Sequence, residues 1–181
     1  MTRPPFARRL RLRPVACLGA AAGLAATLLA GCALLQPPAL RSGMNEAEVV
    51  ALLGRLTARH ALPQGSQRLE FARGPFGRET WMVDLDAQGR STAWLQALEE
   101  PRLHAFQQRA PGMSRDELLR TLGTPGERAG AFRGIEIWSW RYRTNDCLWF
   151  QVTLEPAGGP VRDAGWGPDP MCDRGERDGR K

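Results

Sequence analysis

Apolar side chains recur at helical spacing in two short stretches of the chain, residues 45–54 and residues 114–123. Each stretch places three aliphatic side chains on one helical face. These residues are Val49, Leu52 and Leu53 in the first stretch, and Leu118, Leu119 and Leu122 in the second. The pattern predicts two short amphipathic helices, each with its apolar face on a core.

Both stretches also carry residues that begin and end helices. Asn45 and Ser114 can each accept a hydrogen bond from the backbone amide three positions later. A glutamate stands at that third position in both stretches and can complete a capping box. Gly54 and Gly123 follow where a left-handed C-terminal residue is favoured. We assign these residues a structural role and no chemistry.

The two stretches are copies of one sequence. Residues 42–54 align without gaps on residues 111–123, and five of the thirteen positions are identical. Two further positions exchange valine for leucine, and the offset between Gly43 and Gly112 is 69 residues. Such self-similarity predicts a duplicated structural unit.

Strand-like segments follow each predicted helix. Alternation is clearest at Leu148, Phe150, Val152 and Leu154, which should all face the helix. We predict strands over residues 67–73, 79–86 and 91–98 in the first unit, and over residues 135–143, 148–155 and 161–166 in the second. Residues 86–89 form a predicted turn, and a further helix is expected over residues 101–109.

The N-terminus has the composition of an export signal. Five arginines precede an uncharged apolar run over residues 15–30, which is short for a membrane span. The run ends in Leu29-Ala30-Gly31-Cys32, which resembles the bacterial lipobox. That resemblance implies cleavage between Gly31 and Cys32 and lipidation of the Cys32 sulfur. An ordinary signal peptide with an incidental cysteine, or an uncleaved anchor helix, remains the alternative.

Lipidation would anchor the protein to a membrane without spanning it. Ala33 follows the cysteine, and under the sorting rule of similar lipoproteins an alanine here indicates the outer membrane. Residues 32–41 then form a tether that contains Pro37 and Pro38. At about 3.5 Å per residue this tether spans at most roughly 30 Å, so the folded part stays near the bilayer.

The charge of the whole chain is misleading. Its net charge is +6, but removal of the five signal-peptide arginines leaves 20 basic and 19 acidic residues, a net charge of +1. The basic character therefore belongs mostly to a segment that is cut off, and export excludes nucleic acid as a partner. Residues 173–181 mix both signs of charge without apolar residues and predict a disordered polar tail.

Cys147 and Cys172 are the two cysteines left after the signal peptide and the lipidated residue are set aside. An even pair in an exported protein predicts a disulfide. The turn at residues 156–160 strengthens this prediction, because antiparallel strands around it bring the two cysteines together. Two free buried thiols are the alternative, and a metal site would need more ligands than His60 and His104 supply.

The lipobox, the Gly-Met helix and a tryptophan-bearing strand together resemble the SmpA/OmlA (BamE-like) family of outer-membrane lipoproteins. The second unit carries the match through residues 112–113, Glu117, residues 122–125 and residues 138–142. The first unit lacks the Thr-Pro that follows the second helix. The family fold sets two helices against a three-stranded antiparallel sheet, and tandem use of such a module is similar to the β-lactamase inhibitor protein.

We therefore expect an α+β fold of tandem small modules, each with one or two short helices packed on a three-stranded antiparallel sheet. The expected divisions are a signal peptide at 1–31, a tether at 32–41, modules at 42–98 and 99–172, and a tail at 173–181. The resemblance implies a non-catalytic role beside the machinery that inserts β-barrels into the outer membrane, although a shared fold does not fix function.

Candidate catalytic chemistry is sparse. The sequence has no Gly-x-Ser-x-Gly, His-Glu-x-x-His or phosphate-cradling glycine loop. His60 and His104 occur singly, and adjacent Glu99 and Glu100 suit a helix N-terminus better than an acid/base pair. Asp84-x-Asp86 lacks the other ligands of a calcium loop and favours a turn. We predict no enzyme activity, no cofactor, no metal and no small-molecule substrate.

Binding has more candidate residues. Trp138, Trp140 and Tyr142 share a strand face, and we interpret the two tryptophans as core residues. Trp149 should point away from the core, and Arg141 and Arg143 lie opposite Trp138. Since tryptophan and arginine are enriched at interface centres, Trp149, Arg141 and Arg143 are the candidate partner-binding residues.

These observations favour an outer-membrane-anchored, periplasm-facing accessory or scaffold protein that acts by protein–protein contact, with the barrel-assembly machinery as a candidate partner. The alternative is a lipid-anchored inhibitor or sensor that binds one periplasmic enzyme through a sheet face. A hydrolase with an unrecognised site is the third hypothesis.

Overall fold

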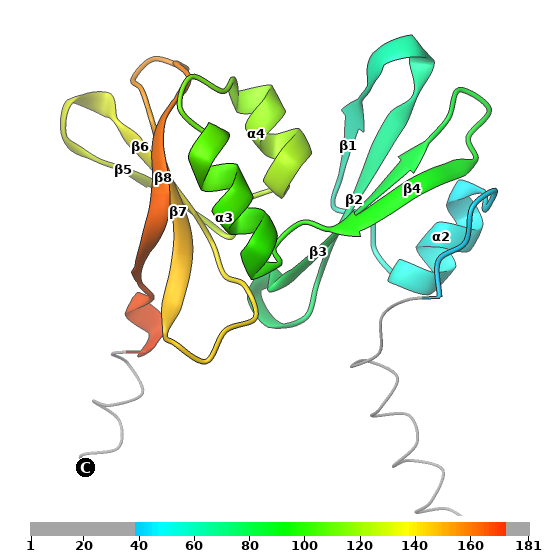
Figure 1. Cartoon of the computed structure of the whole chain (residues 1–181), viewed down its shortest axis with the longest axis horizontal. Coiled ribbons are helices and arrows are strands. Elements are labelled where there is room, and N and C mark those ends of the chain that lie inside the picture. The colour runs from blue at the N-terminus through cyan, green and yellow to red at the C-terminus, as the bar shows by residue number, and fades with distance from the viewer. Residues whose placement is uncertain (1–38, 173–181) are drawn as a thin grey trace, which may run out of the picture. The chain divides into compact units, whose positions relative to one another are not determined.

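The computed structural model describes residues 39–172, which fold into two similar modules within one compact unit. Each module contains a four-stranded antiparallel sheet, with one α-helix in the first module and two in the second (Figure 1). The helices are α2 (Glu46–Leu53), α3 (Glu100–Arg109) and α4 (Arg115–Leu122). The fold class expected from the sequence, α+β with tandem small modules, is confirmed.

The first sheet has the order β1-β2-β3-β4 and the second the order β5-β6-β7-β8. The strands of the first are β1 (Ala58–Ala61), β2 (Gln67–Arg73), β3 (Glu79–Leu85) and β4 (Ser91–Gln96). Those of the second are β5 (Glu127–Gly130), β6 (Glu136–Trp140), β7 (Leu148–Leu154) and β8 (Val161–Pro168). The expectation of three strands per sheet is therefore wrong by one edge strand in each module.

The two missed strands, β1 and β5, are short and carry no apolar alternation. β1 mixes alanines with Arg59 and His60, and β5 is exposed at all four residues. An edge strand of this kind is held by backbone hydrogen bonds to one neighbour and packs little side chain on the core. The pattern of hydrophobic residues in the sequence therefore does not reveal such an edge strand.

The duplication extends over the whole module. α2 and α4, β1 and β5, and β3 and β7 each begin and end at positions 69 residues apart. The short turns η2 (Pro63–Gly65) and η4 (Phe132–Gly134) share this offset, and both contain a non-glycine residue with φ near +60°, Gln64 at 61° and Arg133 at 60°. Matched positions in the two modules can therefore be compared directly.

The predicted caps form at both copied helices. Asn45 Oδ1 accepts the Glu48 amide at 3.0 Å and Glu48 Oε2 accepts the Asn45 amide at 2.8 Å, a complete capping box. At α4 only the Ser114 half is present, where Oγ accepts the amide three residues on at 3.2 Å. Gly54 and Gly123 end the helices with φ of 86° and 84°, but their ψ values of −144° and −171° lie outside the left-handed helical region. That combination is essentially restricted to glycine.

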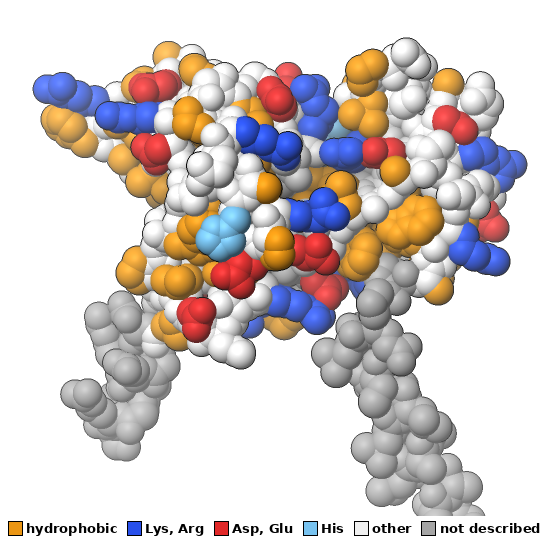
Figure 2. All heavy atoms as spheres, viewed as in Figure 1, with side chains coloured by type: hydrophobic (Ala, Val, Ile, Leu, Met, Phe, Trp, Pro, Cys, Tyr) orange, Lys and Arg blue, Asp and Glu red, His pale blue; other side chains and the backbone are white. Residues whose placement is uncertain are grey.

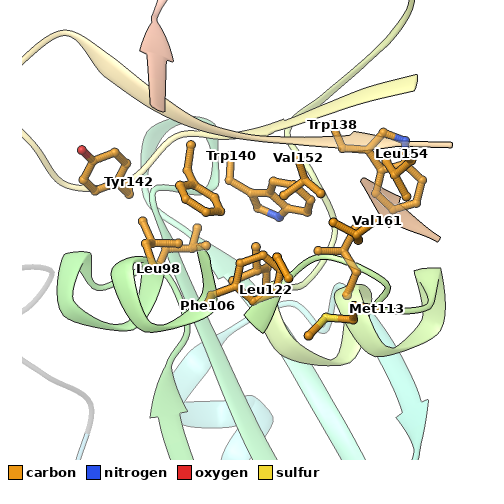
Figure 3. Close-up of a cluster of buried hydrophobic side chains, with 14 residues drawn as sticks. Leu98, Phe106, Met113, Leu122, Trp138, Trp140, Tyr142, Val152, Leu154 and Val161 are labelled. Atoms are coloured by element: carbon orange, nitrogen blue, oxygen red, sulfur yellow. The ribbon is translucent and has the colours of Figure 1, made fainter. Parts of the chain in front are cut away.

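Each module has its own hydrophobic core between its sheet and its helices. The first core consists of Leu40, Met44, Val49, Leu53, Leu69, Phe71, Val83 and Leu85. The second has fourteen buried residues because α3 contributes Leu103, Phe106 and Ala110 in addition to the side chains of α4 (Figure 3). The interpretation of Trp138 and Trp140 as core residues is confirmed.

The alternation along β7 holds at three of its four predicted positions, since Phe150, Val152 and Leu154 are fully buried in the core, whereas Leu148 is half-buried and lies outside it. One helix position departs from the prediction. Leu52 was expected on the buried face of α2, but its residue surface is 40% exposed, and only Val49 and Leu53 are buried there.

A disulfide joins Cys147 and Cys172, whose Cα atoms lie 5.9 Å apart. The antiparallel pairing of β7 with β8 brings these ends together, and the Asp169 amide donates to the Cys147 carbonyl at 2.9 Å. The predicted pairing of the two cysteines is present.

Several expectations lie outside the described residues. These are the signal peptide, the cleavage site at Gly31, the lipidation site at Cys32, most of the tether, and the tail from residue 173. Among the helices in residues 39–172, none combines the length and apolar character needed to cross a bilayer.

Candidate functional site

Two of the three candidate partner-binding residues are buried. The expectation that Trp149 is accessible is wrong, because only 7% of its surface is exposed. Strand alternation does direct its indole away from the core, but the Arg141 guanidinium stacks over that ring at 4.9 Å. Arg141 in turn lies 5.6 Å from the ring centre of Phe76, which belongs to the η3 turn (Pro75–Gly77) of the first module. Arg141 therefore covers the Trp149 ring, and Phe76 of the first module contacts Arg141.

The buried Arg141 is neutralised by Asp169. Its Nε and Nη2 donate to the two carboxylate oxygens at 2.6 and 2.9 Å. Burial raises the pKa of Asp169, but the hydrogen bonds from Arg141 and the Met171 amide, with the charges of Arg141 and Arg78, outweigh it, so the net pKa lies below the ordinary value. Two parallel hydrogen bonds to a shielded carboxylate make this a structural pair.

Arg143 is more than half exposed, but it forms an ion pair with Glu79 of β3. The pair joins the loop after β6 to the first module. Of the three residues chosen from the sequence, Trp149 and Arg141 are therefore buried in structural contacts, and Arg143 is exposed beside its ion pair with Glu79.

The isolated histidines and acids also have structural partners. His60 Nε2 lies 2.9 Å from Glu70 Oε2, and His104 packs on the Trp166 ring at 4.4 Å. Glu99 and Glu100 stand at the N-terminus of α3, as predicted. Within residues 39–172, no group of three or more His, Cys, Asp or Glu side chains is arranged to hold a metal ion.

Asp84 and Asp86 also serve structure. Asp84 accepts two hydrogen bonds from Arg68, at 2.6 and 2.7 Å. Asp86 caps the turn before β4 by accepting the amides of Gln88 and Arg90 at 3.0 and 2.8 Å. The turn interpretation is confirmed for Asp86, whereas Asp84 lies within β3.

The C-terminal end of α4 packs directly on the first sheet. Glu70 of β2, fully buried, accepts the Thr124 amide on Oε1 at 2.8 Å. Arg68 Nη1 donates to the Arg120 carbonyl at 2.8 Å. A Cβ added to Gly123 would lie 2.8 Å from Thr80 Cγ2, so only a glycine fits this approach. The face of the first sheet opposite α2 is thus covered by the second module.

A cleft of about 260 Å³ lies at this junction, and we take it as the candidate interaction site. Four of its described lining residues are apolar and three are arginines, while none is acidic. The lining residues are Arg68, Leu95, Ala97, Arg102, Ala105, Arg109, Thr121 and Leu122. Figure 2 shows orange side chains in a hollow between α3 and β4, with blue side chains around it.

The three arginines differ in how far their charge is neutralised. Arg68 is held in the bidentate pair with Asp84, and Arg102 has only an exposed contact with Glu99 at 3.2 Å. Arg109 forms no ion pair within residues 39–172. Arg102 and Arg109 stand seven residues apart on α3 and therefore on the same helical face. Two exposed guanidinium groups are thus available beside the apolar side chains of the cleft.

Sequence reasoning missed this cleft because its parts come from both modules. In the sequence, Arg102 and Arg109 look like ordinary solvent-facing residues of an amphipathic helix. Their seven-residue spacing was the one available signal, but it does not tell which surface they face. Only the docking of α3 and α4 on the first sheet brings Leu95 and Ala97 beneath them.

Comparisons with protein-family models, with curated proteins and with solved structures find no match to this chain.

Proposed function

We propose that the chain is a lipoprotein of the bacterial outer membrane, anchored through a lipid on Cys32, that acts without catalysis through protein–protein contact. In this role it serves as an accessory or scaffold factor in outer-membrane protein assembly or envelope maintenance. The arginine-lined cleft between the modules carries the proposal, because arginine beside apolar surface is characteristic of interface centres.

The cleft favours a partner segment with a carboxylate next to a small apolar side chain. Arg102 and Arg109 supply hydrogen-bond donors in a planar fork that matches a carboxylate. Leu95, Ala97 and Ala105 supply the apolar contact surface. Binding that depends on these exposed charges should weaken as salt increases.

The proposed location at the outer membrane rests on the N-terminal sequence. An arginine-rich start, an uncharged apolar run and Leu29-Ala30-Gly31-Cys32 together support lipidation at Cys32. Mass spectrometry of the native protein tests this part separately. A diacylglyceryl group on an N-terminal Cys32 is the expected result, whereas retention of residues 1–31 would contradict the proposed membrane anchoring.

Co-purification tests the interaction. Native membranes are crosslinked and extracted in mild detergent, and the proteins that accompany the chain are identified. Changing Arg102 and Arg109 to glutamate should remove the specific partner. Arg55 and Arg162, two exposed arginines outside the cleft lining, give a control with the same change in net charge. Equal loss of the partner in both double variants would contradict a role for the cleft.

A second candidate function is inhibition or sensing of one periplasmic enzyme through a sheet face. The observation in its favour is that α3 and α4 both pack on one face of the second sheet, which leaves the face with Ile137, Gln151 and Thr153 without a described helix. Recovery of a single soluble enzyme would support this function, and recovery of barrel-assembly components would support the first.

A further inference from the structure

In the second module, α3 covers the part of the sheet formed by β7 and β8. The Phe106 ring packs edge-on against Phe150 of β7, with ring centres 5.9 Å apart. Gln107 Nε2 donates to the Ala164 carbonyl of β8 at 3.0 Å. The apolar side chains of α3 stand at positions 103, 106 and 110, and all three are fully buried.

The first module presents the matching surface without a described helix over it. The 69-residue offset places Trp81 of β3 at the position of Phe150. Val83 pairs with Trp94 in the first module, as Val152 pairs with Ala164 in the second. Trp94 therefore corresponds to Ala164, the β8 residue that contacts α3. Phe150 is fully buried, whereas Trp81 is half-buried and Trp94 is 37% exposed.

By the 69-residue offset, Leu52 of α2 should border the same surface, and its residue surface is 40% exposed. Its counterpart in α4 is Thr121, which lines the cleft together with Ala105 of α3. A polar residue therefore stands beside the helix in the covered module, and an exposed leucine stands at the matched place in the open one. We call the surface formed by Leu52, Trp81 and Trp94 the helix seat.

The chain's own sequence does not favour a helix over this seat. Residues 31–40 stand at the positions matched to α3, and there Pro37 and Pro38 replace Phe106 and Gln107. A proline inside a helix removes a backbone hydrogen bond and clashes with the preceding turn. The aromatic side chain that anchors α3 is also missing from this segment.

We propose that the helix seat of the first module binds an amphipathic helix of a partner protein, with apolar side chains spaced i, i+3 and i+7. The second module supplies the argument, because α3 fills the matched surface with that spacing. This inference rests on the proposed function, because both require the chain to act by contact with another protein. It adds a second surface, separate from the arginine-lined cleft, and specifies what binds there.

A peptide of residues 99–110 serves as the probe, because it carries the side chains that fill the seat in the second module. Its binding to the full chain in detergent is followed by fluorescence anisotropy. We expect saturable binding that Leu52→Lys and Trp94→Lys each weaken about tenfold. Phe132→Lys, at a residue 80% exposed on the η4 turn, is the control and should leave binding unchanged. A peptide with Leu103→Glu and Phe106→Glu should not bind.

Photocrosslinking in native membranes identifies the occupant without relying on the folding of lysine variants. A photoreactive residue is placed at position 52 or 94, and the crosslinked atoms are mapped by mass spectrometry. Crosslinks to one partner protein, on a segment with the i, i+3, i+7 pattern, are the expected result. Crosslinks to lipid, to residues 33–38 of the same chain or to a second copy would overturn the inference.

The same experiment separates this inference from the proposed function. A photoreactive residue at position 109 reports on the cleft. Protein crosslinks at position 109 without helical crosslinks at positions 52 and 94 would leave the proposed function in place and overturn the helix seat. Absence of protein crosslinks at all three positions would contradict both.

Discussion

Gly123 and Gly54 occupy matched positions but meet different surroundings. Both have positive φ, yet a Cβ at Gly54 would contact nothing within 4 Å, whereas at Gly123 it would lie 2.8 Å from Thr80 Cγ2 and 3.0 Å from Glu70 Cδ. Backbone strain alone should make Gly54→Ala cost about 1–3 kcal/mol. Gly123→Ala should cost about 1–3 kcal/mol more, because the new methyl group overpacks the junction.

Urea unfolding of the two glycine variants measures that difference. Equal losses of stability would mean that the end of α4 does not pack tightly on the first sheet in solution.

Asp169 should make stability depend on pH. Its pKa in the folded state lies below the ordinary value, mainly because hydrogen bonds from Arg141 and the Met171 amide outweigh the effect of burial. A carboxylate of this kind stabilises the fold above its unfolded pKa, and the contribution is lost as pH falls through the folded pKa. Asp169→Asn should therefore cost about 3–5 kcal/mol at neutral pH.

The difference between wild type and Asp169→Asn should shrink between about pH 5 and pH 2, as measured by denaturant unfolding. Glu127→Gln is the control, because Glu127 lies 3.8 Å from Arg141 and is half exposed. Its effect should stay below about 1 kcal/mol. A difference for Asp169→Asn that is constant over this pH range would contradict the assignment.

At the scale of elements, the disulfide ties the start of β7 to the segment after β8. Its cysteines are 25 residues apart, and closing a loop of that length stabilises a fold by about 3.5 kcal/mol in the chain-entropy model. Replacing both cysteines with serine should lower the free energy of unfolding by about that amount. Reduced wild type should match the double variant, and insensitivity of the wild type to reductant would contradict the prediction.

The elements also differ in how visible they were in the sequence. α2, α4, β2 and β7 follow from caps and apolar periodicity, because one face of each packs on a core. β1 and β5 could not be predicted in this way. Their place in the fold depends on backbone hydrogen bonds to β2 and β6, which side-chain patterns do not report.

At the scale of the whole molecule, Glu70 connects the modules. Its two carboxylate oxygens contact the Thr124 amide and His60 Nε2 at 2.8 and 2.9 Å. Glu70→Ala should cost about 2–3 kcal/mol, because it leaves buried polar groups without partners. Glu70→Gln retains an acceptor for the Thr124 amide and should cost less.

Hydrogen exchange measures this directly. In Glu70→Ala the Thr124 amide should exchange faster than in wild type, while amides in the middle of β7 should keep their protection. Uniform acceleration across the second module would indicate general destabilisation and contradict a local role at the junction.

The sequence by itself determined the duplicated modules, the copied helices with their caps and the pairing of Cys147 with Cys172. These features depend on residues close together in the chain or on a regular spacing of residues, and both can be recognised in the sequence. Only the tertiary structure decided that Trp149 and Arg141 are buried, that Leu52 is exposed and that Arg102 and Arg109 border a cleft. The physical reason is that the burial of these side chains depends on which segments, distant in the sequence, pack over them. The docking of one module on the other sets that contact.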